Sequence, residues 1–310
     1  MPINSIEIYL KTFSMSVLSY LLFFFSGIFL IKYLNVRKYR IILIWSWIIY
    51  SLVVAFNITN DEKGFRLAMH GEQIYLMLAD AYAVLCIFIF SIAKSKKLKV
   101  LVFLIASVLL FTMLSRTTLY FFVFTIILYF TIKQPKIIVL FFISGIIFMS
   151  FTDLTDLMNS RMGERMFGLI LGNEDSSAES RSHTFTNGIS NLKSNFLFGD
   201  LLGDVRDNYG ITGSYIHNYL SFWANFGLIP FLMLLFLIFT NGLLIYKRLI
   251  FKKFNSNIEI FLFIYFTFFL LEIIFSRAYL SSYIWFVFSA APIALGRKEK
   301  YYSRTEKTLG

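Results

Sequence analysis

Long apolar runs separated by short polar and basic segments dominate the chain. The runs at 21–31, 100–114, 137–151 and 228–239 are apolar on every face of a helix. Helices of that kind must be buried on all sides, and so many of them in one chain indicate a lipid environment. The pattern predicts an all-α fold, a polytopic integral membrane protein that forms a single membrane domain over residues 1–310.

Nine segments have about the length of a membrane span. They are 12–31, 41–57, 73–93, 99–115, 117–132, 137–152, 225–246, 257–275 and 279–295. Only Ser115 and Arg116 separate the fourth from the fifth, so a tight hairpin or a re-entrant pair is an alternative to two full spans. The first segment is too long for the core of a signal peptide and lacks a small-residue cleavage site, so we interpret it as a retained span.

Composition and charge agree with a membrane protein. The chain is 58% hydrophobic and 15% charged, with a mean hydropathy of +0.71, whereas soluble domains are about 25% charged. The net charge of +11 does not indicate a nucleic-acid partner, because most basic residues lie in short connections between spans. When alternate connections are assigned to the cytoplasm, 19 of the 29 Lys and Arg residues fall there and 10 on the other side. The positive-inside rule then predicts an outer N-terminus and a cytoplasmic C-terminus.

One outer loop, residues 153–215 between the sixth and seventh spans, is large enough to hold a site. Its first half, 154–170, carries apolar residues at three- and four-residue spacing, with Arg161 and Arg165 about one turn apart. This spacing predicts an amphipathic helix that lies among the lipid headgroups.

The second half of the loop predicts another helix. It begins with an acidic stretch at 174–179 that we expect to be flexible, and Ser182 is then the expected N-cap. Apolar residues follow at i, i+4, i+7 and i+11 between Phe185 and Phe196. Four glycines between 199 and 213 indicate a turning segment that leads into the seventh span.

His217 is the first candidate for chemistry, because it stands where the outer loop meets the membrane. It is followed by Asn218, a candidate supporting residue, and then by aromatic residues suited to a membrane interface. A neutral imidazole there could take a proton from a hydroxyl group near neutral pH. The alternative is an interfacial histidine that only forms hydrogen bonds with the loop.

Arginines form the second set of candidates. Arg116 stands at the end of an apolar helix, where its charge is compensated either by lipid headgroups or by a ligand phosphate. Arg181 is expected beside the start of the second loop helix, where free N–H groups favour an anion, although a solvated loop charge is an alternative. Arg161, Arg165 and Arg277 are candidate supporting residues or headgroup contacts.

Other features limit the possible chemistry. We expect Asp80, in the middle of the third span, to pair with a basic or hydroxyl group of a neighbouring helix. Cys86 is the only cysteine, so the chain can form neither an internal disulfide nor a thiolate cluster. The sequence also lacks a P-loop and the HExxH, CxxC and DxD motifs, so we expect no metal and no cofactor.

The order of these elements resembles that in the bacterial O-antigen polymerase and O-antigen ligase superfamily of inner-membrane glycosyltransferases. Ser115-Arg116-Thr117 stands at a helix end, Arg181 precedes a helix that closes in NFLFGDLLG, and His217-Asn218 comes before Gly227. The resemblance covers roughly residues 100–240. Family members often carry about ten to fourteen spans with both termini in the cytoplasm, so nine spans would be a departure.

The resemblance implies a polyprenyl-diphosphate-dependent glycosyltransferase that acts at the periplasmic face of the bacterial inner membrane. Arg116 and Arg181 would hold the diphosphate, and His217 would deprotonate the acceptor hydroxyl. We favour a polymerase of repeat units, which makes O-antigen or a related surface polysaccharide, over a ligase that transfers glycan to lipid A–core. From another class, a flippase or other transporter of lipid-linked oligosaccharides is the alternative.

The implied partners follow from this reaction. They are an undecaprenyl-diphosphate-linked oligosaccharide donor and acceptor and the membrane lipids. A chain-length regulator and a flippase are further candidate partners, and no nucleic acid is expected.

Overall fold

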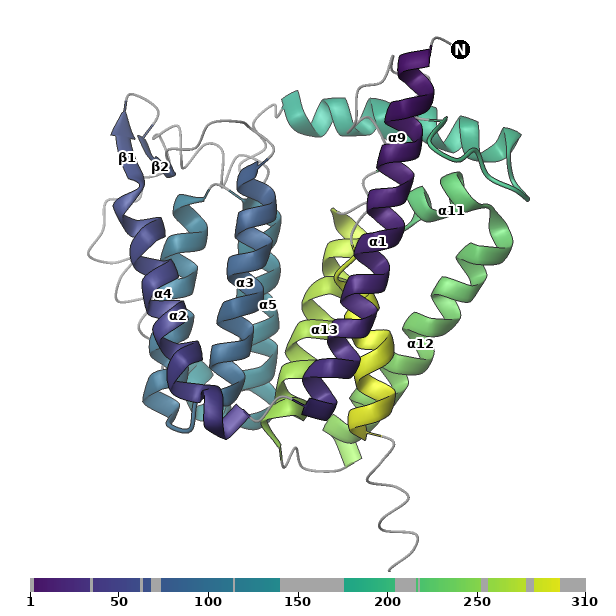
Figure 1. Ribbon diagram of the computed structural model, residues 1–310. Helices are drawn as coiled ribbons and strands as arrows, with labels where there is room; N and C mark the ends of the chain where they lie inside the picture. Colours follow the sequence, from purple (N-terminus) through teal and green to yellow (C-terminus); the bar gives the residue numbers. More distant parts are fainter. Residues whose placement is uncertain are drawn as a thin grey trace, which may run out of the picture. The chain divides into compact units, whose positions relative to one another are not determined.

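The computed structural model describes residues 3–33, 36–61, 64–67, 74–113, 115–139, 176–203, 216, 218–251, 256–276 and 282–295. These residues are mostly helical (Figure 1). The chain divides into two compact units, which are described one at a time. The first unit consists of Met1–Leu34 and Ser176–Gly310, and the second unit of Asn35–Asp175.

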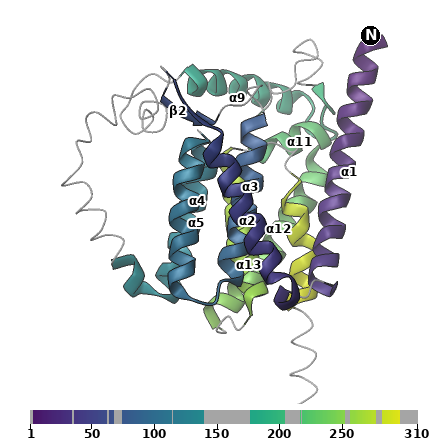
Figure 2. The ribbon, with the colours of Figure 1, turned by 60° about the vertical axis from the view of Figure 1, so that its left-hand side comes forward.

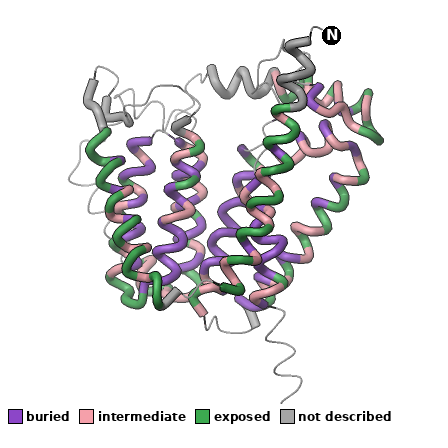
Figure 3. The backbone as a smooth tube through the Cα atoms, viewed as in Figure 1, coloured by how far each residue is buried: buried purple, intermediate pink, exposed green. Residues whose placement is uncertain are grey.

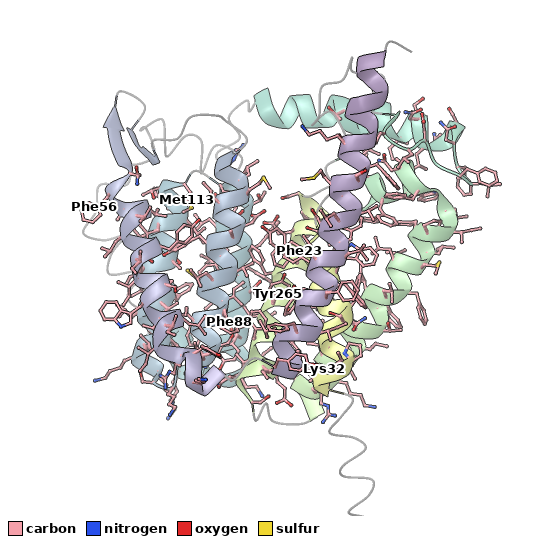
Figure 4. The ribbon with its side chains drawn as sticks, in the orientation of Figure 1. Phe23, Lys32, Phe56, Phe88, Met113 and Tyr265 are labelled. Carbon is pink, nitrogen blue, oxygen red and sulfur yellow. The ribbon has the colours of Figure 1, made fainter. Side chains whose placement is uncertain are left out.

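In the described part of the second unit, four helices form a bundle and are connected in chain order. They are α2 (Val36–Phe56), α3 (Ile74–Ile92), α4 (Lys96–Thr112) and α5 (Arg116–Lys133). They run alternately up and down and lie side by side (Figures 1 and 2). Phe56 and Met113 therefore lie at the same end of the bundle (Figure 4).

The two ends of this bundle differ in charge. Arg116 starts α5 at the end marked by Met113, and Arg66 lies in a short strand that follows α2. Most other basic residues of the described part of this unit lie at or near the opposite helix ends. They are Arg37, Lys38, Arg40, Lys94, Lys96, Lys97, Lys99, Lys133 and Lys136.

Aromatic side chains form much of the core of the second unit. Tyr82, Phe90, Phe122 and Phe130 are fully buried, and the rings of Phe90 and Phe130 meet edge to face. The hydroxyls of Ser51 and Tyr82 form a hydrogen bond of 2.8 Å that joins α2 to α3. A buried pair of hydroxyls satisfied in this way fixes the register of the two helices without leaving an unpaired polar group.

Lys99, the first residue of the predicted span 99–115, has a buried side chain that is only 7% exposed. Its Nζ donates a hydrogen bond to the Tyr129 hydroxyl over 3.0 Å and lies 5.2 Å from the centre of the Phe90 ring. A hydroxyl oxygen and aromatic ring faces can compensate an ammonium group at the edge of an apolar core.

A short β-hairpin is an addition to the otherwise helical fold that the sequence predicted. Strands β1 (Ile58–Asp61) and β2 (Gly64–Leu67) pair antiparallel, with Ile58 opposite Leu67. The β-branched residues Ile58 and Thr59 and the aromatic Phe65 favour extended backbone. Four-residue strands are too short to give a clear alternating pattern of apolar and polar residues in the sequence.

In the first unit, helices α1 (Ile3–Tyr33), α12 (Leu228–Phe251), α13 (Asn257–Phe275) and Tyr283–Leu295 pack together, and the last of these has no label in Figure 1. Helices α9 (Ser176–Ser194) and α11 (Leu220–Phe226) lie at one end of this unit, and α9 runs across the helix direction of α1. Lys32 marks the other end (Figure 4).

Helix α13 is the centre of the first unit and is buried around most of its circumference (Figure 3). Ser256 and Glu259 form a reciprocal capping box that fixes its start. The hydroxyl of Tyr265 donates to the carbonyl oxygen of Tyr283 over 3.0 Å, which joins α13 to the last helix. Helix α1 closely approaches the last helix, Tyr283–Leu295, at Gly27, where a Cβ atom would collide with Ser289.

Five of the described helices are long and apolar enough to cross a membrane. Their apolar parts are Lys11–Tyr33, Lys38–Phe56, Arg116–Lys133, Leu228–Leu249 and Asn257–Phe275, and two shorter apolar helices are Leu76–Ile92 and Tyr283–Leu295. Figure 3 shows exposed faces along α1, α2 and α12, as expected of helices that meet lipid. These features agree with a helical, multi-pass membrane protein. The predicted span 137–152 lies largely outside the described residues.

Candidate functional site

Arg116 begins α5 in the second unit, at the helix end where the sequence placed it. The side chain is half-buried. Ser115 is the N-cap residue, but its hydroxyl makes no capping hydrogen bond to the first N–H groups of the helix, and only its carbonyl oxygen accepts from Leu119 N, over 3.0 Å. The start of α5 therefore combines a guanidinium group with the positive end of a helix dipole, an arrangement that favours an anion.

A buried chain of hydrogen bonds supports this helix start. The Thr118 hydroxyl donates to Asp80 Oδ1 over 2.7 Å, and the hydroxyls of Ser115 and Thr118 lie 2.7 Å apart. Thr118 has one hydroxyl proton, which it gives to Asp80, so Ser115 must be the donor to Thr118. The chain runs from Ser115 through Thr118 to Asp80, so the proton of the N-cap hydroxyl points toward the Thr118 side chain.

The structure confirms one prediction for Asp80 and corrects another. Its pairing with a hydroxyl of a neighbouring helix is confirmed. It does not lie in the middle of its helix, however, because it comes only six residues after Ile74, about 9 Å along the axis of α3. At 6% exposure its carboxylate is buried beside the N-terminal turn of α5, where a negative charge is stabilised by the helix dipole.

Arg181 lies in the first unit, and its local setting differs from the prediction. Helix α9 begins at Ser176, so Ser182 is inside the helix and is not its N-cap. Arg181 is the sixth residue of α9 and not the residue that opens it, so its place in the helix differs from the prediction, while its role as an anion ligand stays a prediction. The stretch expected to be flexible contributes the first turn instead, where Ala178 and Glu179 favour a helix start.

A compact junction holds the end of α9 against α11 and the start of α12. Asp200 N donates to Ala224 O over 2.7 Å, and Leu228 N donates to Leu197 O over 3.1 Å. The indole of Trp223 donates to Phe196 O over 2.8 Å. We call residues 196–203 together with 221–228 the α9–α12 junction.

Asn225 and two glycines complete the junction. Asn225 Oδ1 accepts from Leu202 N over 2.7 Å, while its amide donates to Ser221 O over 2.9 Å. Gly199 and Gly227 both have positive φ, at 69° and 84°, and their backbones lie against one another. A side chain at Gly227 would collide with the carbonyl oxygen of Leu197. The two chain segments are therefore fixed at backbone distance.

His217 itself lies outside the described residues, but both of its neighbours are anchored. Ile216 is buried, and it lies so close to Gly188 of α9 that a Cβ atom on this glycine would collide with it. Asn218 Oδ1 accepts from Leu220 N over 2.9 Å, and Asn218 O accepts from the Ser221 hydroxyl over 2.7 Å. Asn218 thus has a definite role in starting α11, in addition to the supporting role that the sequence suggested.

The remaining candidate residues Arg161, Arg165 and Arg277 also lie outside the described residues, so their roles stay predictions. Among the residues that the structure describes, no group of three or more His, Cys, Asp or Glu side chains could hold a metal ion. Sequence reasoning did not find Thr118 or Asn225. The one available indication for Asn225 was a lone amide between aromatic residues in the run SFWANFG.

Comparison with protein-family models, curated proteins and solved structures finds no match to this chain. The functional argument therefore depends on the chemistry of the residues described above and on the resemblance in residue order.

Proposed function

We propose that this protein is a membrane glycosyltransferase that polymerises undecaprenyl-diphosphate-linked oligosaccharide repeat units into O-antigen or a related surface polysaccharide. The observation that carries the proposal is Arg116 at the start of α5, beside a helix end whose N-cap hydroxyl is engaged with Thr118. A half-buried guanidinium at a positive helix end suits a diphosphate, which accepts paired N–H donors.

The proposed orientation puts Arg116 on the periplasmic side of the bacterial inner membrane. In the second unit, most of the described basic residues lie at the helix ends opposite Arg116, and the positive-inside rule assigns such an end to the cytoplasm. With nine spans, the same rule makes residues 153–215 a periplasmic loop. The residues on either side of His217 are held in place, Ile216 against Gly188 of α9 and Asn218 at the start of α11.

The proposed reaction uses a donor that is already activated. Arg116 and Arg181 bind the diphosphate and stabilise the negative charge that develops as the bond between the sugar and the phosphate oxygen breaks. His217 takes the proton from the acceptor hydroxyl as its oxygen forms the new glycosidic bond. The products are a lengthened lipid-linked glycan and undecaprenyl diphosphate, so the transfer needs neither a nucleotide nor a metal ion.

Purified full-length protein in lipid vesicles tests this proposal directly. It is incubated with a lipid-linked repeat unit alone and, separately, with the repeat unit and lipid A–core, and products are separated by glycan length. A ladder of longer lipid-linked glycans in the first mixture is the expected result. Arg116→Gln should abolish the ladder, whereas Lys97→Gln, a change of an exposed residue at the other end of the bundle, should leave it intact.

The competing functions give different products. A ligase would lengthen nothing in the first mixture and would transfer glycan to lipid A–core in the second. A flippase or transporter would form no new glycosidic bond in either mixture but would move the labelled lipid between leaflets. Either result would overturn the assignment as a polymerase.

A further inference from the structure

Three consecutive apolar residues are exposed on the loop that follows α9. Phe196 is 45% exposed, Leu197 56% and Phe198 87%. We call these three residues the apolar tip. An exposed cluster of this kind beside a packed junction costs free energy in water, so it indicates contact with another apolar phase or surface.

The backbone of the apolar tip is held in place by the α9–α12 junction. The carbonyl oxygens of Phe196 and Leu197 accept from the Trp223 indole and from Leu228 N, the first residue of α12. The Phe196 ring also packs edge to face on Trp223, with 5.0 Å between ring centres, and Trp223 stacks on Phe231 of α12. The tip is therefore fixed beside the first turns of α12.

Helix α12 indicates which environment surrounds this part of the chain. Six of its exposed apolar residues recur at helical spacing, namely Ile229, Leu232, Met233, Phe236, Phe239 and Leu243. From the first to the last they cover about 21 Å of helix axis, most of the roughly 30 Å thickness of a hydrocarbon core. This face is apolar along a helix long enough to cross a membrane, so its partner is lipid.

We propose that the apolar tip inserts into the lipid of the membrane interface and anchors the α9–α12 junction there. The tip lies beside the N-terminal turn of α12, and aromatic side chains are favoured at the membrane interface where such a helix begins. Lys193, exposed in the last turn of α9, and the polar Ser194 precede the tip. A cation beside an inserted apolar group suits the anionic headgroups of a bilayer.

This anchor fixes how deep α9 and α11 lie relative to the bilayer surface, because both helices are attached to the junction. Asn218 and the start of α11 then lie at the level of the lipid headgroups. The anchor depends on the exposure of the apolar tip, on the hydrogen bonds that hold its backbone and on the exposed apolar side of α12. It does not depend on the proposed glycosyltransferase activity.

Single-cysteine labelling of the full-length protein tests the anchor. In a Cys86→Ala background, an environment-sensitive fluorophore is attached at Phe198→Cys or at Ser190→Cys, an exposed serine earlier on α9. The proteins are reconstituted in vesicles of phosphatidylethanolamine and phosphatidylglycerol. Quenching is measured with spin-labelled lipids and with aqueous iodide, and Phe236→Cys on the exposed face of α12 serves as the lipid-facing control.

The label at residue 198 should be quenched by a spin label near the headgroup end of the acyl chain at least twofold more strongly than the label at residue 190. It should also be protected from iodide, whereas the label at 190 should be open to it. Equal iodide access at the two positions would overturn the proposal. Protection at 198 without quenching by lipid would also overturn it, since that result indicates a protein surface against the tip.

Discussion

The hydroxyl of Thr118 donates a 2.7 Å hydrogen bond to Oδ1 of Asp80, and so joins the first turn of α5 to the second turn of α3. Both residues are buried. The bond places a carboxylate beside the positive end of α5 and fixes the helix that starts with Arg116. Buried polar groups such as these have few alternative partners, because the apolar side chains around them cannot form hydrogen bonds.

We predict that Thr118→Val lowers the free energy of unfolding by about 1–3 kcal/mol, because it removes a donor from a buried carboxylate. Thr118→Ser keeps the hydroxyl and should restore most of the loss. Thr125 is the matched control, since it is buried on the same helix and its hydroxyl has no hydrogen-bond partner among the residues that the structure describes. Thr125→Val should be neutral or slightly stabilising. Thermal unfolding in detergent compares the three variants, and equal losses for both valine changes would refute the role of the bond.

Gly227→Ala should destabilise the α9–α12 junction. The residue has φ 84° and ψ 178°, a conformation that is nearly restricted to glycine and costs other residues about 1–3 kcal/mol. The added Cβ would also collide with Leu197 O. We expect faster proteolysis between residues 195 and 203 and a lower unfolding temperature.

Gly242→Ala is the control for this change, because its Cβ would meet only the edge of the Phe266 ring at 3.2 Å. Its proteolysis pattern should match that of the wild type. A Gly227→Ala protein that resisted protease as well as the wild type would show that the two segments can separate without loss.

Sequence patterns predicted a helix best where a capping motif stands directly before a continuous apolar run. The predicted span 257–275 coincides with α13 (Asn257–Phe275), since a capping box precedes a continuous apolar run. The predicted start of α9 was wrong because Ser176 and its neighbours are polar. They show no apolar periodicity, although they can form a helix. Hydrophobic spacing alone does not detect a helix turn of that kind.

Contacts between distant segments could not be predicted in the same way. Asp80 was expected to find a hydroxyl partner, but nothing local identifies Thr118, which is 38 residues away. The junction depends on backbone groups such as Asp200 N and Ala224 O. Backbone N–H and C=O groups occur along the whole chain, so the sequence does not indicate which of them form hydrogen bonds with one another.

The topology makes a further prediction. Cysteines introduced at Ser177 in α9 and at Ser95, the N-cap of α4, in a Cys86-free background should lie on opposite sides of the membrane. An impermeant thiol reagent applied to intact spheroplasts should label residue 177 and leave residue 95 unlabelled until the membrane is opened. The reverse pattern would place Arg116 in the cytoplasm and overturn the proposed site.

For Arg116, lysine should be a poor replacement even though it keeps the charge. A guanidinium presents paired donors to two phosphate oxygens, whereas an ammonium acts as a point charge. We expect Arg116→Lys to lower polymer formation at least tenfold and to weaken binding of the lipid-linked donor, with yield and unfolding temperature close to wild type. Full turnover by the lysine variant would show that this residue acts as a headgroup anchor and does not clamp the diphosphate.

The last prediction concerns His217, where a general base and a structural histidine have different consequences. If the imidazole takes the proton from the acceptor, His217→Ala should lose on the order of 10²-fold or more in turnover, while the donor still binds through the arginines. His217→Gln keeps hydrogen bonding but has no base that works near neutral pH, so it should be almost as damaging. A structural histidine predicts another order, in which glutamine largely restores activity and alanine fails through poor folding. Turnover, donor binding and protein yield, measured for both variants, separate the two roles, and an active glutamine enzyme would exclude His217 as the base.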